Sequence, residues 1–97
     1  DWMTGARMPT SRGGVASAVL DGRLYVFGGE GAPDVASGVF DAVEVYDVAG
    51  DRWSVLEPMP SPRHGMGAAA VDGRIIIPGG ADEQAFGAVE TVSSYQP

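Results

Sequence analysis

The chain repeats its own sequence at a fixed distance. When the 97-residue sequence is shifted by 51 positions, residues of the same type fall on one another. The matching pairs are Trp2 with Trp53, Met8-Pro9 with Met59-Pro60, Arg12 with Arg63, Gly14 with Gly65, Asp21-Gly22-Arg23 with Asp72-Gly73-Arg74, and Gly28-Gly29 with Gly79-Gly80. A repeat of this length is one supersecondary unit, which buries its apolar face only against a neighbouring unit. The sequence therefore predicts two stacked units rather than one self-contained small domain.

Each copy of the repeat predicts four short antiparallel strands, of which the second copy holds three. The predicted ranges are 15–20, 24–27, 43–46 and 53–56 in the first copy, and 66–71, 75–77 and 92–95 in the second. The Asp-Gly pairs predict hairpin turns, because a two-residue turn of type I′ needs positive φ at both positions. After the double glycine the offset falls to 49, which aligns Tyr46 with Tyr95. An offset of 46, which aligns Phe40 with Phe86, stays open as the alternative.

Composition narrows the possible functions. Cysteine and lysine are absent, which excludes a disulfide, a cysteine nucleophile, a Schiff base and a P-loop lysine. The net charge of −7 argues against a nucleic-acid partner, since binding to phosphates needs clustered cations. No apolar run has the roughly 20 residues of a membrane span, and we expect neither a membrane partner nor a signal peptide. The 15 glycines and 7 prolines argue against a helical bundle.

The repeat resembles the kelch repeat. The residues that carry this resemblance are Arg12, the run 24–29 with its double glycine, the run 43–47, and Trp53 after it. The resemblance implies an all-β fold of four-stranded antiparallel propeller blades around a central channel. The residues expected to be structural are Gly28, Gly29, Gly79, Gly80, Tyr46, Tyr95, Trp2 and Trp53. We expect the aromatic residues at repeat positions to pack between blades rather than to form a sugar-binding platform.

Counted as blades, the chain holds one spare strand and lacks another. Residues 1–10 match the fourth strand of a neighbouring blade, residues 11–58 make a full blade, and residues 59–97 make a second blade without its fourth strand. We expect the spare strand to complete a blade of another copy and so to give a homo-oligomeric ring. Six blades from three chains are favoured over four blades from two. The alternative is that the chain is an excised or engineered piece of a longer kelch protein.

Three kinds of side chain are candidates for ligand binding. Arg12 and Arg63 begin the first strand of each copy, where a ring of arginines could bind carboxylates or phosphates; alternatively, each anchors a loop through backbone carbonyls. His64 is the only histidine, so it could bind a metal only where three copies meet, and an ordinary loop position is the alternative. The loop carboxylates, among them Glu30 and Asp82, match no calcium-loop spacing. We therefore expect no metal and no cofactor.

The resemblance to kelch proteins implies a non-catalytic interaction module or scaffold. Such a propeller binds a protein or a small ligand through loops at one end of its channel, here the loops near 5–12, 30–39, 56–63 and 81–90. An acidic surface favours a basic partner. The alternative is a sugar-active, isomerase-like enzyme that uses Arg63, His64 and loop carboxylates. A copper oxidase of this family is excluded because it needs a cysteine, and no nucleophile elbow of a hydrolase occurs.

Overall fold

The computed structural model describes all 97 residues and consists of strands and loops. The strands are β1 Ala16–Leu20, β2 Arg23–Phe27, β3 Val43–Asp47, β4 Arg52–Val55, β5 Ala69–Val71, β6 Arg74–Pro78, β7 Ala81–Glu83, β8 Phe86–Ala88 and β9 Val92–Tyr95. The structure contains no helix that is long and apolar enough to cross a membrane. The all-β prediction is therefore confirmed.

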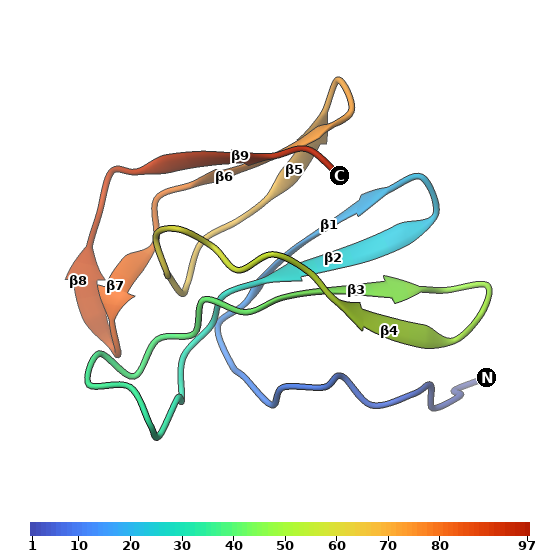
Figure 1. Cartoon of the computed structure of the whole chain (residues 1–97), viewed down its shortest axis with the longest axis horizontal. Helices are drawn as coiled ribbons and strands as arrows, with labels where there is room; N and C mark the ends of the chain where they lie inside the picture. The colour runs from blue at the N-terminus through green and yellow to red at the C-terminus, as the bar shows by residue number, and fades with distance from the viewer.

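The strands form two main antiparallel sheets, which we call the first and second blades. The first blade has the strand order β1-β2-β3-β4, and the second blade has the order β5-β6-β9. Strands β7 and β8 make a separate two-stranded hairpin inserted between β6 and β9. Figure 1 shows the two blades side by side, with the tight hairpin turns at one end of the molecule. The long loop 28–42 and the β7–β8 hairpin lie at the opposite end, which we call the loop end.

The Asp-Gly turns have the backbone that the sequence predicts. Asp21 and Gly22 have φ of 51° and 75°, and Asp72 and Gly73 have φ of 49° and 77°. Positive φ at both central positions matches the twist of a two-residue hairpin to that of its strands. Each turn therefore fixes the register of the first two strands, Leu20 opposite Arg23 in the first blade and Val71 opposite Arg74 in the second.

The third strand of the second blade follows the offset of 49. Leu24 pairs with Tyr46 in the first blade, and Ile75 pairs with Tyr95 in the second. The alternative offset of 46 is wrong, because Phe86 lies in β8 of the inserted hairpin and not in the third strand. The loop of the second blade is thus two residues shorter than that of the first.

The hydrophobic core lies between the two blades. Its buried members are Ala16, Ala18, Tyr25, Phe27, Val43, Val45, Met59, Met66, Ile75 and Ile77. The Tyr95 ring of β9 packs against two rings of β2, at centroid distances of 6.0 Å to Tyr25 and 5.8 Å to Phe27. Each blade therefore buries its apolar face only by contact with the other, as the repeat predicts.

The N-terminal segment forms no strand within this chain. Residues 1–8 lack regular structure, and the side chains of Trp2 and Met3 are fully exposed. The expected fourth strand around Trp2 is therefore absent here, because a strand needs the edge of a sheet to pair with. Its place in a neighbouring blade stays a prediction. Further along the segment, Ala6 is held against the first blade, since its carbonyl oxygen accepts a hydrogen bond from the Trp53 indole N–H at 2.9 Å.

Candidate functional site

Arg12 ties together three strands of the first blade. Its Nη1 donates to the carbonyl oxygens of Gly28 at 2.6 Å and Ala42 at 3.0 Å. Its Nη2 lies 2.7 Å from Glu44 Oε1, and both side chains are buried in this ion pair. Thr10 Oγ1 donates to the other carboxylate oxygen at 2.6 Å. The guanidinium thus fixes the end of β2 and the start of β3 to the segment before β1.

Arg63 makes the equivalent contacts in the second blade. Its Nη1 donates to the carbonyl oxygens of Ile77, Gly79 and Thr91 at 3.0, 2.8 and 3.0 Å. Only 1% of the residue surface is exposed. This is the loop-anchoring geometry that was the alternative for both arginines, and it directs their donors toward the protein interior.

The two arginines differ in their counter-charge. Ser93 occupies the strand position that Glu44 has in the first blade, and its Oγ accepts from Arg63 Nη2 at 2.6 Å. Arg63 therefore has only neutral acceptors. Burial lowers the pKa of Arg63 below its ordinary value. The Nε of Arg12, by contrast, is the one buried side-chain nitrogen in the chain without a hydrogen-bond partner.

His64 joins the two blades at the loop end. Its Nδ1 lies 2.6 Å from Glu30 Oε2 of the first blade, and its Nε2 lies 2.6 Å from the Glu83 carbonyl oxygen in the inserted hairpin. Both partners are acceptors when Glu30 is ionised, so both contacts are hydrogen bonds only when each ring nitrogen carries a proton. The sequence places His64 beside Arg63 in the second copy of the repeat. It does not predict the contact with Glu30, because Glu30 belongs to the first copy. No group of three His, Asp or Glu side chains is placed to hold a metal ion.

Two glycines bring the blades into backbone contact. Gly29 N–H donates to the Arg63 carbonyl oxygen across the interface at 2.9 Å. Gly28 has a φ of 64°, and a Cβ at this position would overlap the same carbonyl oxygen. Their counterparts Gly79 and Gly80 also have positive φ, but Gly79 has no close neighbour beyond Val89 O at 3.7 Å. The double glycine therefore permits close approach of the next blade.

The predicted aromatic residues fall into two groups. Tyr25 and Tyr95 lie at the interface between the blades, as expected. Trp53 is half-buried and lies on the other face of the first blade, where its ring is 4.9 Å from that of Tyr46. Trp53 is thus not part of the core between these two blades, which corrects the expectation for it. The Tyr46 hydroxyl donates to Asp51 Oδ1 at 2.5 Å, and this bond raises the pKa of Tyr46.

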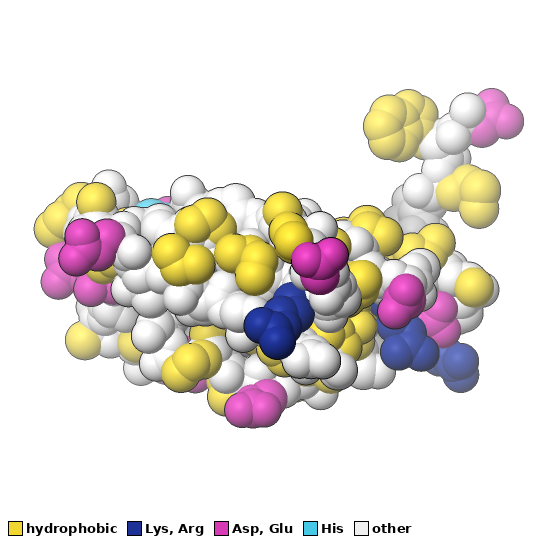
Figure 2. All heavy atoms as spheres, turned by 90° about the horizontal axis from the view of Figure 1, so that it is seen from above, with side chains coloured by type: hydrophobic (Ala, Val, Ile, Leu, Met, Phe, Trp, Pro, Cys, Tyr) yellow, Lys and Arg dark blue, Asp and Glu magenta, His cyan; other side chains and the backbone are white.

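The loop end is acidic. Its carboxylates are Glu30, Asp34, Asp41, Asp82, Glu83 and Glu90, of which all but Glu30 are exposed. The exposed arginines are Arg7, Arg23, Arg52 and Arg74, which lie in the N-terminal segment or at the hairpin turns. Figure 2 shows acidic side chains without an arginine at this end of the molecule. The loop 28–42 and the β7–β8 hairpin are in contact at this end, because Gln84 N–H donates to the Ser37 carbonyl oxygen at 2.9 Å.

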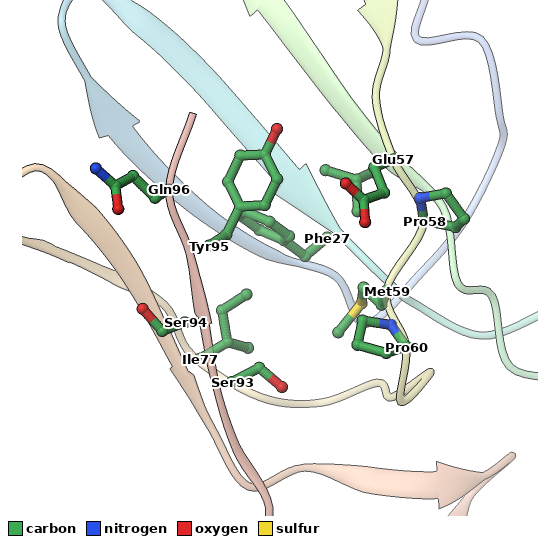
Figure 3. Close-up of a pocket in the computed structure, with 11 residues that line it drawn as sticks. Phe27, Glu57, Pro58, Met59, Pro60, Ile77, Ser93, Ser94, Tyr95 and Gln96 are labelled. Carbon is green, nitrogen blue, oxygen red and sulfur yellow. The ribbon is translucent and has the colours of Figure 1, made fainter.

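A cavity of about 400 Å³ lies between the blades, away from the loop end. Figure 3 shows Tyr95 on one side of this cavity and Glu57 and Pro58 on the other. Ser93 and Ile77 lie toward its base. A smaller cavity of about 290 Å³ is formed by residues of the loop 32–41 and Pro62.

Comparison with known proteins gives a consistent set of relatives. A family model described as the Kelch motif matches residues 11–60. Kelch-like protein terF of Aspergillus terreus is 38% identical over 90 residues, which cover 93% of this chain and 20% of that protein. Kelch repeat and BTB domain-containing protein 12 of Homo sapiens is 35% identical, with 81% of this chain and 14% of that protein covered. N-acetylneuraminate epimerase of Brucella suis is 40% identical, with 75% of this chain and 20% of that protein covered.

A solved structure supports the same assignment. The structure of YjhT superposes with a TM-score of 0.75 at 31% sequence identity, and the match covers 86% of this chain and 25% of that one. The chain thus spans about a quarter or less of the relatives described here. The residues that match the family model contain all four strands, the Asp-Gly turn and the double glycine of the first blade. The sheets are therefore propeller blades, and the chain belongs to the kelch-repeat family.

Proposed function

We propose that the chain is a non-catalytic interaction module that binds a basic segment of a partner protein at its acidic loop end. Kelch propellers typically serve in protein interactions, and loops on a rigid scaffold are the usual place for binding. The observation that carries the proposal is the separation of charge, with five exposed carboxylates at the loop end and no exposed arginine there. Such a surface attracts a cationic segment from a distance and favours it over an acidic one.

The proposal is tested with a short lysine- and arginine-rich peptide and an acidic peptide of the same length. We expect calorimetry to detect binding of the basic peptide alone, and to show that binding weakens as salt rises, because exposed charges are screened. Asp82→Asn combined with Asp34→Asn should weaken binding several-fold. Asp21→Asn removes a charge at the turn end, tolerates the positive φ there, and should leave binding unchanged. No binding, or equal effects of both sets of variants, overturns the proposal.

A sugar-active enzyme is the second candidate. Its support is the 40% identity to the N-acetylneuraminate epimerase of Brucella suis. Arg63 and His64, the residues considered for catalysis, are buried and bonded to groups of the chain itself, which favours the first proposal. The two are separated by an epimerase assay with N-acetylneuraminate. Activity that is lost in His64→Ala and Arg63→Ala chains of unchanged circular dichroism supports the enzyme, and its persistence excludes these residues as catalysts.

We also propose that the chain associates with copies of itself, with three chains completing a six-bladed ring. The interface inside the chain supports this, because each blade offers the same two faces to its neighbours. The outward face of the second blade carries Ile76 and Val92 at the positions of the buried Tyr25 and Val43. Light scattering should give about 30 kDa, three times the chain mass of 10.0 kDa, as a closed ring requires. A well-folded monomer at all concentrations contradicts the proposal and favours a piece of a longer propeller.

A further inference from the structure

We propose that His64, Glu30 and the Glu83 carbonyl group form a proton-dependent clasp, which holds the loop end closed and releases it as the pH rises. The clasp joins three parts of the chain, the long loop 28–42 of the first blade, the start of the second blade and the inserted hairpin. The inference concerns the conformation of the loop end, so it goes beyond the proposed binding and stands whichever partner is bound there.

The imidazole of His64 is enclosed between two acceptors. Its Nδ1 lies 2.6 Å from Glu30 Oε2, and its Nε2 lies 2.6 Å from the Glu83 carbonyl oxygen. Only 7% of the His64 surface is exposed, so water has little access to the ring. The backbone of His64 is also fixed, because it exchanges two hydrogen bonds with Ala81 of β7, at 3.0 and 2.9 Å. The ring is therefore held between the blades and depends on these two partners.

The two contacts need one more proton than a neutral histidine and an ionised glutamate carry. A carbonyl oxygen only accepts, so Nε2 must hold one proton. A second proton must lie between Nδ1 and Glu30 Oε2, whether it is assigned to the ring or to the carboxyl group. Without it, either neutral tautomer of the ring leaves a nitrogen lone pair against an acceptor oxygen, and that contact becomes repulsive.

The direction of the pH effect follows from this count of protons. The closed clasp binds one proton more than the open clasp, so a rise in pH favours the open state. Histidine is the side chain that ordinarily gains and loses a proton between about pH 5 and 8. We therefore expect the loop end to be closed at the lower end of this range and open at the upper end.

The other charged groups around the imidazole do not pair with it. Glu30 is the one carboxylate that forms an ion pair with the ring. The side chains of Asp82 and Glu83 in β7 are exposed, and Glu83 contacts the ring through its backbone. Arg63 directs its guanidinium group to carbonyl oxygens of its own blade. Gly14, which lies beside the pair in the first blade, has no side chain. The proton therefore belongs to the histidine and Glu30 together.

Opening of the clasp leaves the β7–β8 hairpin weakly held to the first blade. Besides the clasp, one hydrogen bond joins them, from Gln84 N–H to the Ser37 carbonyl oxygen at 2.9 Å. The Gln84 side chain also lies against Gly38. Figure 1 shows this hairpin and the loop 28–42 at the same end of the molecule, beyond the ends of the main sheets. The hydrophobic core contains no residue of the hairpin, so the two sheets stay folded when the loop end opens.

The test follows the single histidine of the full 97-residue chain by NMR. The ring signals of His64 report the loss of the proton, and hydrogen exchange of the Gln84 amide reports the opening of the loop end. We expect the protection of this amide, corrected for the intrinsic rise of exchange with pH, to fall several-fold at the pH where the ring signals change. The amides of β2 in the middle of the first blade should keep their protection.

Glu30→Gln tests the mechanism, because the glutamine amide can donate to Nδ1 of a neutral ring whose Nε2–H still donates to the Glu83 carbonyl. The loop end of this variant should stay closed at high pH, with Gln84 protected several-fold more than in the wild-type chain. Glu57→Gln makes the same chemical change away from His64 and should keep the wild-type pH dependence. His64→Ala should be open at every pH. Wild-type protection that does not fall when the ring loses its proton, or equal profiles of Glu30→Gln and the wild-type chain, overturns the proposal.

Discussion

At the scale of single residues, two buried arginines do most to define the blades. Arg12 and Arg63 each bond to backbone carbonyls at the same three places of their repeat, one in the second strand, one just after it and one just before the third strand. The sequence predicts these equivalent positions and includes loop anchoring among their roles. It does not predict the carboxylate partner of Arg12, because Glu44 follows it by 32 residues and has no acidic counterpart in the second copy.

We expect Glu44→Ala to lower the free energy of unfolding by about 3–5 kcal/mol, because it leaves the buried Arg12 cation without its partner. Urea denaturation followed by circular dichroism measures the loss. Thr10→Ala is the control, since it removes only a hydrogen bond to the same carboxylate and should cost about 1 kcal/mol. Equal effects of the two changes would show that the ion pair does not contribute as proposed.

Gly28→Ala should destabilise the chain by more than the roughly 1–2 kcal/mol that an L-residue pays for positive φ. The added Cβ overlaps the Arg63 carbonyl oxygen, which belongs to the other blade. Gly73→Ala is the matched control, because Gly73 also has positive φ and its Cβ would meet no atom within 4 Å. Thermal unfolding of the two variants compares them directly. Equal shifts would mean that close approach of the blades adds nothing to the backbone strain.

At the scale of elements, regular turn residues make the strands of both blades predictable, whereas no such signal marks the inserted hairpin β7–β8. Asp-Gly pairs and the double glycine give clear boundaries, so the strands of both copies were located from the sequence. Strand β7 contains Asp82 and Glu83, residue types that are depleted in strands. It forms because Ala81 exchanges two backbone hydrogen bonds with His64, at 3.0 and 2.9 Å, a tertiary contact that no local pattern reveals.

The segment before the first blade should detach from it in acid. The hydrogen bond from Ala6 N–H, and next that from the Tyr46 hydroxyl, hold the pKa of Asp51 below its ordinary value of 3.8. A lowered pKa in the folded state stabilises the contact at pH above 3.8, and this stabilisation is lost as the pH falls through the lowered value. In a Trp2→Phe chain, the Trp53 emission should report the loss. Asp51→Asn should remove this pH dependence, and a persistent acid transition in that variant would contradict the assignment.

At the scale of the whole molecule, stability resides in the contact between blades. The core contains residues of both sheets, and neither sheet has a core of its own. The sequence predicts this arrangement from the repeat alone. It does not predict the link from His64 to Glu30, because the two residues lie in different copies and no spacing within a repeat brings them together.

Phe27→Ala should lower the free energy of unfolding by about 3–5 kcal/mol, as truncation of a buried aromatic ring does. The ring packs against Tyr95 of the second blade, so both blades should lose stability together in one transition. Val55→Ala is the control on the exposed side of β4, where a change of less than about 0.5 kcal/mol is expected. Separate unfolding of the two blades, seen as two transitions, would contradict a shared core.

The arginine anchors also bear on how such proteins grow during evolution. Apart from a long contact of Arg12 Nη2 with Met8 Sδ at 3.9 Å, the hydrogen bonds of the Arg12 and Arg63 guanidinium groups end within the blade to which each arginine belongs. A gene duplication with boundaries in the linker 56–62 therefore copies the cation together with every acceptor that it needs. A recombination point between the first and third strands would separate them and leave a buried charge without partners. We therefore expect duplications that keep the fold to comprise whole blades, and the two copies here differ in the partner of their arginine, Glu44 in one and Ser93 in the other.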